Sequence, residues 1–544
     1  MTVKLGRRER EELDPAIPAR PRLADDVQVH APEHEGAPWI IQRGPGRYIR
    51  VGADMARLGR ALDGDRDHAE LMADLGPKWT PQALGYALGE LQRMKLLDDG
   101  SRGRSATAPW VKYVPPLTLQ ITLLRPARLL AWCRPLLAAL ANRFWAVVAV
   151  VIALAGPVSL ALNGGALAQA LGSPLPLSVY AWVAAGSYLV MVVHELSHGA
   201  VLSHYGGRPS RMGVMLLYLL PAFFCDVSDG WRLGHKERRV RVALAGVATQ
   251  FVVAGAVAVV ALPTGEAALL VFSVVTYTSG LLNLLPFIKL DGYLALMSHL
   301  DISDLRKRAM IDARRLVTRL LFGGTYPVEL PGLRWAVPYG LACLVFPVYL
   351  VGVLALSLWG ELLRGLGLLG TVAISVVVLL LLGRLLVGFL LRVQEARTSG
   401  ASVWRIGGVI AVLACGLTAV LMTVQVPYVI SGGYHYRQGQ LELVVPGGDE
   451  AITRGAQVRL LRNGVVLREQ VGSAVVASAT ASSTTVPISA LLPIRAEGTL
   501  PMTVSAYPLT VRETPGERSG AARVDAGSRP LGEWLVATYL PLTW

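Results

Sequence analysis

Long apolar stretches separated by short polar segments occupy the middle of this 544-residue chain. An apolar helix of about 20 residues is long enough to cross a bilayer. The pattern predicts seven membrane spans, at residues 144–162, 176–204, 240–262, 267–290, 336–358, 366–391 and 406–425. The apolar segment 212–225 is too short to span and predicts a re-entrant segment of irregular backbone.

The polar ends of the chain have patterns of their own. Two β-prone runs within 39–51 flank a Gly-Pro-Gly turn, and three helix-period segments follow at 53–62, 67–75 and 81–96, which together predict a winged-helix domain. Beyond the last span, short alternating runs predict an antiparallel β domain, with EWLVATYL (533–540) as a strand and Asn463-Gly464 as a hairpin turn.

These patterns divide the chain into seven parts. The first three are a flexible polar N-terminus (1–36), the winged-helix domain (37–100), and a linker with an interfacial helix (101–142). The remaining four are a transmembrane core (143–300), a basic loop (301–335), further transmembrane helices (336–427) and the β domain (428–544).

Composition agrees with an integral membrane protein. Hydrophobic residues make up 53% of the chain and charged residues only 17%, and the mean hydropathy is +0.46. Much of the net charge of +14 lies in loops that follow the even-numbered spans, so the positive-inside rule places those loops and the N-terminus in the cytoplasm. We therefore expect the lipid bilayer as a partner, no nucleic acid, and a C-terminal domain outside. The four scattered cysteines predict no disulfide framework.

A metal-binding pattern lies inside the second span, in the sequence HELSH at 194–198. On a helix His194 and His198 are one turn apart and share a face, so their imidazoles can hold one Zn²⁺. Glu195 lies beside them and can accept a proton from water. A catalytic zinc site needs a further protein ligand, and Asp291 supplies a carboxylate at the end of a later apolar run, where an unpaired charge would cost at least about 2.5 kcal/mol.

HELSH in one span, together with N-x-x-P-x-x-x-x-D-G at 283–292, resembles the site-2-protease (M50) class of intramembrane zinc metalloproteases. The resemblance covers roughly residues 144–300. It implies a single zinc ion with the ligands His194, His198 and Asp291, and Glu195 as the general base. It also implies that Asn283 and Pro286 shape the substrate approach.

The N-terminal run RYIRVGADMARLGRALDGDRDHAELMADLG, with its continuation to LLDDG, resembles the PqqD-like peptide-recognition domains of ribosomal-peptide biosynthesis. A DNA-binding winged helix and a cytosolic cap without a ligand remain open alternatives. Domain order as a whole resembles the intramembrane metalloproteases of daptide-type peptide biosynthesis. That resemblance implies a bacterial cytoplasmic-membrane endopeptidase that removes the leader from a small hydrophobic ribosomal precursor peptide. The cut peptide would leave the cell through this chain or through a separate peptide exporter.

Other functions stay open at this point. A general site-2 protease that releases a membrane-tethered regulator would use the same zinc residues, and a non-catalytic transport or immunity protein could keep the fold. Asp226 and Asp229 in DVSDGW could tune the site, although ordinary loop carboxylates are the preferred interpretation. Arg384, inside the sixth predicted span, is a secondary candidate because intramembrane arginines are commonly functional.

Overall fold

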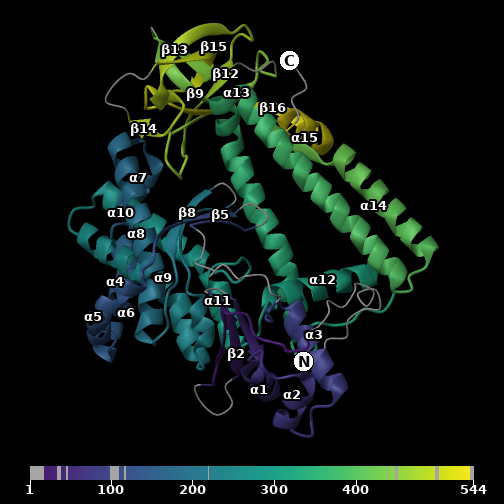
Figure 1. Cartoon of the computed structure of the whole chain (residues 1–544). Coiled ribbons are helices and arrows are strands. Elements are labelled where there is room, and N and C mark those ends of the chain that lie inside the picture. The colour runs from purple at the N-terminus through teal and green to yellow at the C-terminus, as the bar shows by residue number, and fades with distance from the viewer. Residues whose placement is uncertain are drawn as a thin grey trace. The chain divides into compact units, whose positions relative to one another are not determined.

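The structure is a computed structural model that describes residues 18–32, 38–44, 47–98, 110–114, 118–217, 220–437, 439–447, 451–495 and 501–539 (Figure 1). The chain divides into two compact units. The first contains residues 1–150, 188–251 and 294–301, and the second contains residues 151–187, 252–293 and 302–544. The boundaries between the units fall inside continuous helices, except the boundary between residues 301 and 302, which lies between α11 and α12.

The first unit begins with a three-stranded antiparallel sheet followed by three helices. The strands are β1 (Val27–His30), β2 (Trp39–Arg43) and β3 (Arg47–Val51), and the helices are α1 (Ala53–Ala61), α2 (His68–Leu75) and α3 (Pro81–Arg93). Ile41 from the sheet and Leu58, Leu71 and Leu88 from the helices are fully buried in one core. The predicted hairpin and three helices are confirmed, whereas β1 lies within the segment predicted to be a flexible N-terminus.

A second sheet in this unit was not expected. Its order is β4 (Val111–Val114), β5 (Thr118–Leu124), β7 (Met212–Leu217) and β8 (Leu220–Cys225), and all pairs are antiparallel. The segment predicted to be re-entrant is thus the β7–β8 hairpin, whose β7 backbone polar groups also pair with β5.

The predicted linker and interfacial helix are partly wrong for the same reason. Residues 118–124 form β5, and only then do two short helices follow, α4 (Ala127–Trp132) and α5 (Arg134–Leu140). Pairing with a strand about ninety positions later in the chain overrode the local pattern of leucines and arginines. Residues 101–109 and 115–117 of the predicted linker lie outside the described residues.

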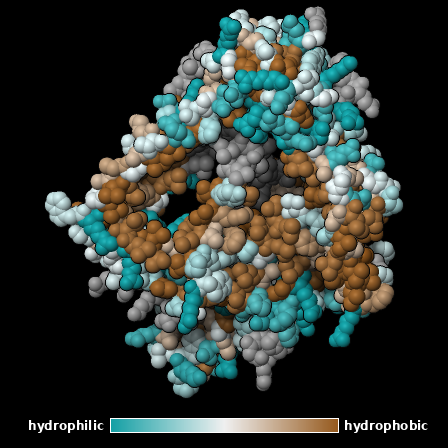
Figure 2. All heavy atoms as spheres, turned by 180° about the vertical axis from the view of Figure 1, so that it is seen from behind, coloured by the Kyte–Doolittle hydropathy of each residue, from teal (hydrophilic) through white to brown (hydrophobic). Residues whose placement is uncertain are grey.

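Within the described residues, four helices are long and apolar enough to cross a membrane. They are α6 (Arg143–Leu162), α8 (Leu177–His204), α9 (Lys236–Ala261) and α14 (Val403–Thr423). Large apolar side chains such as Leu154, Trp182 and Leu417 are exposed on three of them, and Figure 2 shows broad hydrophobic areas on the face that it draws. Such surfaces are far larger than a soluble monomer exposes, as expected of a membrane protein.

Shorter helices complete this part of the chain. They are α7 (Gly164–Gly172), α10 (Ala267–Asn283), α11 (Asp291–Leu300) and α12 (Leu305–Phe322), with a 3₁₀ turn at Ser228–Arg232. The fourth predicted span therefore ends at Asn283 instead of residue 290, because Pro286 interrupts it. Most of the predicted basic loop is the helix α12.

The fifth and sixth predicted spans lie on one helical element, α13 (Ala336–Thr398), which must fold back on itself. A Cβ at Gly340 would lie 2.1 Å from the carbonyl oxygen of Ala309, and Arg315 Nε lies 3.3 Å from Glu395 Oε1. Ala309 and Arg315 are close neighbours on α12, whereas Gly340 and Glu395 would be about 80 Å apart along a straight helix. Figure 1 draws α13 as two limbs.

The C-terminal part of the second unit is an antiparallel β-barrel. Its strands run in the order β10 (Gln440–Val445), β9 (Gln425–Arg437), β16 (Ser519–Pro530), β11 (Gln457–Leu461), β12 (Gln470–Val476) and β15 (Pro501–Glu513). Pairing of β15 with β10 closes the barrel, and β13 (Ser482–Pro487) is added on β15. Tyr434, Leu443 and Val524 are fully buried inside it, so the predicted β domain is confirmed.

Two details of that domain were predicted wrongly. The sequence EWLVATYL belongs to a helix, α15 (Leu531–Tyr539), instead of a strand. Asn463-Gly464 lies in a longer loop that contacts α7, because the backbone N–H groups of Val466 and Leu467 donate to the carbonyl of Leu171. A short parallel pair, β6 (Leu175–Pro176) with β14 (Ile494–Arg495), joins the same regions, and a 3₁₀ turn spans Ile488–Ala490.

Candidate metal centre

Helix α8 carries three of the predicted site residues, His194, Glu195 and His198. The helix continues past them and ends at His204, two residues before Gly206, whose φ of 85° only glycine adopts readily. Both histidines are buried, and their Nε2 atoms lie 3.2 Å apart. Two ligand atoms at about 2.05 Å from a tetrahedral zinc are about 3.3 Å apart, so this pair fits a shared ion.

The hydrogen bond made by Nδ1 of His198 shows which ring nitrogen of this imidazole carries the proton. Nδ1 of His198 lies 2.7 Å from the carbonyl oxygen of Val242 on α9, and a carbonyl can only accept a hydrogen bond. Nδ1 must therefore carry the proton, which leaves the lone pair of Nε2 directed toward His194. An outer hydrogen bond of this kind fixes the tautomer that a metal requires.

Helix α9 also makes room for His194. A Cβ at Gly246 would lie 2.5 Å from Cε1 of the His194 ring and 2.6 Å from both ring nitrogens. Real side chains do not approach that closely, so only glycine at this position lets α9 pack against the imidazole. The sequence contained no pattern that singled out Gly246 before the structure placed it there.

Asp291 is the first residue of α11, and its carboxylate completes the cluster. One ligand atom each from His194, His198 and Asp291 lie within 4.8 Å of one another. Two imidazoles and one carboxylate are a donor set that suits zinc and leaves a fourth position open. Ligand atoms around a tetrahedral zinc are about 3.3 Å apart, which is less than the 4.8 Å within which these three atoms lie. The three side chains would therefore move slightly closer together around an ion.

The backbone ahead of Asp291 explains the D-G part of the motif. A Cβ at Gly292 would lie 1.9 Å from the carbonyl oxygen of Leu284, so the turn that follows α10 closes tightly only over a glycine. The Tyr339 hydroxyl donates to the carbonyl of Pro286 at 2.7 Å and fixes the same turn. Asn283 is the last residue of α10. Neither Asn283 nor Pro286 belongs to the metal cluster, and their role toward a substrate stays a prediction.

Glu195 is held by the β7–β8 hairpin. Its Oε2 accepts a hydrogen bond of 2.7 Å from the backbone N–H of Cys225, the last residue of β8. The hydrogen bond orients the Glu195 carboxylate, and its donor belongs to the segment 212–225, for which the sequence predicted irregular backbone. A carboxylate that accepts such a hydrogen bond can still accept a proton, because its two oxygens together offer about four lone-pair sites.

The secondary candidates lie outside the cluster. The carboxylate of Asp226 accepts hydrogen bonds from the side chains of Ser210, Arg211 and Ser228. Asp229 is engaged in a comparable way with the loop after α8. Arg384 is exposed on α13, so its proposed role gains no support from its position.

Comparison of the chain with protein-family models, with curated proteins and with solved structures finds no match to any of them.

Proposed function

We propose that this chain is an intramembrane zinc endopeptidase. The observation that carries the proposal is the convergence of His194, His198 and Asp291, residues almost a hundred positions apart, on one cluster of metal-binding donors. Glu195, one residue after the first histidine, supplies a candidate general base. Four helices of membrane-spanning length and composition agree with a site inside or beside the bilayer.

The protein's own groups can perform most of the chemistry of peptide hydrolysis. Zinc bound by the cluster would supply Lewis acidity, which polarises a carbonyl group and acidifies water. Glu195 would take the proton from the attacking water and later pass it to the leaving amine nitrogen. Val242 and Cys225 hold His198 and Glu195 in the orientations that these roles require.

The proposed substrate is a small, membrane-associated ribosomal precursor whose leader is removed, as in daptide-type maturation. Support comes from domain order, with a small winged-helix domain in the same compact unit as His194, Glu195 and His198. In this proposal the protein lies in the bacterial cytoplasmic membrane, with the winged-helix domain in the cytoplasm and the β-barrel outside.

Replacing the proposed base tests the assignment. Glu195→Gln keeps the shape of the side chain but removes its basicity, so we expect cleavage of short hydrophobic peptides to fall about 10²- to 10⁴-fold, with zinc content unchanged. Cleavage is followed by mass spectrometry and zinc by elemental analysis of the purified full-length protein. Glu237→Gln, at an exposed position early in α9, is the matched control. Undiminished cleavage by Glu195→Gln would remove the proposed base.

A further inference from the structure

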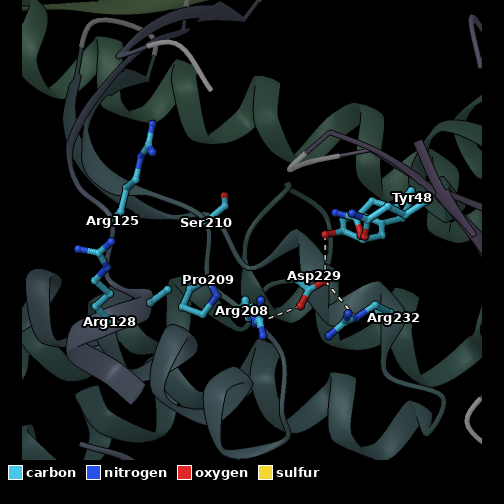
Figure 3. Close-up of a pocket in the computed structure, with 11 residues that line it drawn as sticks. Tyr48, Arg125, Arg128, Arg208, Pro209, Ser210, Asp229 and Arg232 are labelled. Carbon is cyan, nitrogen blue, oxygen red and sulfur yellow. Dashed lines mark hydrogen bonds and ion pairs between the residues drawn. The ribbon is translucent and has the colours of Figure 1, made fainter. Parts of the chain in front are cut away.

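A pocket with a volume of about 620 Å³ lies in the first unit, and its lining includes none of the metal cluster residues. Its walls come from the N-terminal sheet, from the segment that joins β5 to α4, and from the loop between α8 and β7. Figure 3 shows Arg125 and Arg128 on one side and Tyr48, Asp229 and Arg232 on the other. Pockets of this size commonly bind ligands.

The N-terminal sheet contributes a polar row to the pocket. Gln28 on β1 pairs with Gln42 on β2, which in turn pairs with Tyr48 on β3, so the three side chains share one face of the sheet. The neighbouring residue Ile41 is buried in the hydrophobic core on the other face. The amide of Gln42 is already engaged, because its Oε1 lies 2.7 Å from Nε2 of His30 and its Nε2 donates to the carbonyl of Gly44 at 2.9 Å. The amide of Gln28 can both donate to and accept from a peptide backbone.

The charges in the pocket are unbalanced. Among the described residues that line it, the acid is Asp229. It is buried and already engaged, because it accepts from the Tyr48 hydroxyl at 3.0 Å and the Arg208 backbone N–H at 2.7 Å and pairs with Arg232. Burial and the Asp229 carboxylate raise the pKa of Tyr48, so its hydroxyl remains a donor.

The other three arginines of the pocket, Arg125, Arg128 and Arg208, form no ion pair with any residue that the structure describes. Three uncompensated guanidinium groups around one concave site favour an anionic ligand.

We propose that this pocket binds an acidic segment of the peptide substrate, an inference that rests on the proposed peptidase function. Figure 3 shows the side chains of Arg125, Arg128 and Arg208 apart from one another instead of converging on one point, so they suit several carboxylates spread along a peptide better than one compact phosphate. Gln28 suits the peptide backbone between those carboxylates. Residues 208–210 of the pocket also join α8, which carries Glu195, to β7, whose hairpin holds it.

Binding can be measured separately from cleavage. The full-length protein with Glu195→Gln is mixed with a fluorescein-labelled peptide of alternating Glu and Ala, and affinity is read from fluorescence anisotropy. The same peptide with Gln in place of Glu is the neutral probe. We expect the acidic peptide to bind at least about tenfold more tightly than the neutral one, and less tightly as salt increases.

Substitutions then locate the site. Arg125→Gln with Arg208→Gln should weaken binding of the acidic peptide about tenfold or more, and lysine at both positions should restore part of it. The matched control is Arg20→Gln with Arg57→Gln, which removes the same charge from exposed positions outside the pocket. Unchanged thermal unfolding of each variant shows that the fold persists.

Three results would overturn the inference. The first is equal loss of binding in the pocket and control variants, and the second is equal binding of the acidic and neutral peptides. The third is loss of affinity for phosphatidylglycerol nanodiscs, with peptide affinity kept, which would assign the arginines to lipid headgroups. Absence of peptide cleavage by the unchanged, zinc-loaded protein would instead contradict the peptidase proposal and leave the binding result standing.

Discussion

At the scale of single residues, the metal centre depends on close contacts that surround the ligands. His194 fits beside α9 only because residue 246 has no Cβ, and His198 presents the correct nitrogen because Val242 occupies the other one. Catalytic metal sites tolerate little displacement, since ligand atoms must stay within a few tenths of an ångström of their positions.

Gly246→Ala should therefore damage zinc binding without touching a ligand. The new methyl group would overlap the His194 ring, and overpacking of this kind costs about 1–3 kcal/mol and moves the imidazole. We expect lower zinc content and a lower unfolding temperature of the purified protein. Gly89→Ala is the control, because a Cβ there meets nothing within 4 Å. Full zinc occupancy in Gly246→Ala would show that α9 does not constrain the site as described.

At the scale of elements, the N-terminal sheet is tied to the end of α11 by charge. The Arg50 guanidinium on β3 donates to both oxygens of Asp301 at 2.8 Å, and Arg239 on α9 pairs with the same carboxylate. The Arg50 hydrogen bonds, with smaller contributions from both positive charges, hold the pKa of Asp301 below its usual range. Paired in this way, the carboxylate stabilises the docked position of β3.

That depressed pKa fixes the direction of a pH effect. The stabilisation is present above about pH 3.9, the usual value for an unfolded aspartate, and is lost as the pH falls through the lower folded value. Because Asp301 is 44% exposed, we expect at most about 1 kcal/mol. Asp301→Asn should increase hydrogen exchange of β3 (Arg47–Val51) at about pH 7, and the difference from the unchanged protein should shrink as the pH falls through the lowered pKa of Asp301.

Mass spectrometry can follow this exchange peptide by peptide after correction for the intrinsic effect of pH. Asp65→Asn changes an exposed carboxylate of the same domain and serves as the control. Equal exchange of β3 in Asp301→Asn and in the unchanged protein at neutral pH would show that the ion pair does not hold the strand.

At the scale of the whole molecule, the number of membrane crossings decides whether the two ends of the chain lie on the same side of the membrane. The topology that we propose counts α6, α8, α9, α10, α14 and both limbs of α13 as crossings, and this odd number places the N-terminal domain and the barrel on opposite sides. If α13 crossed only once, the number would be even and both would lie on the same side.

Cysteine labelling in cells tests that arrangement. With the four native cysteines replaced, a cysteine introduced at exposed Asp65 should react with a membrane-impermeant maleimide only after the cells are opened. A cysteine at Arg468 in the barrel should react in intact cells. Protection of both positions, or reaction of both, in intact cells would contradict the predicted topology.

The sequence alone determined the features that depend on nearby residues. Helical spacing placed His194 and His198 on one face, apolar length predicted the membrane helices, and period-2 alternation predicted the C-terminal β domain. Asp291 could also be selected, because a lone carboxylate at the end of an apolar run needs a cation. These properties are local or nearly local, so they can be inferred without knowing which distant segments meet.

Only the tertiary structure decided what depends on distant pairing. The segment 212–225 became a hairpin because β5 pairs with it, and Glu195 obtained its orientation from the backbone at the end of that hairpin. Arg125 and Arg128 come from one segment of the chain and Arg208 from another about eighty residues later, and only the fold brings the two segments to one pocket. The pairing of β5 with β7, the packing of Gly246 against His194 and the grouping of the pocket arginines all depend on contacts between distant parts of the chain. No local sequence pattern encodes such contacts.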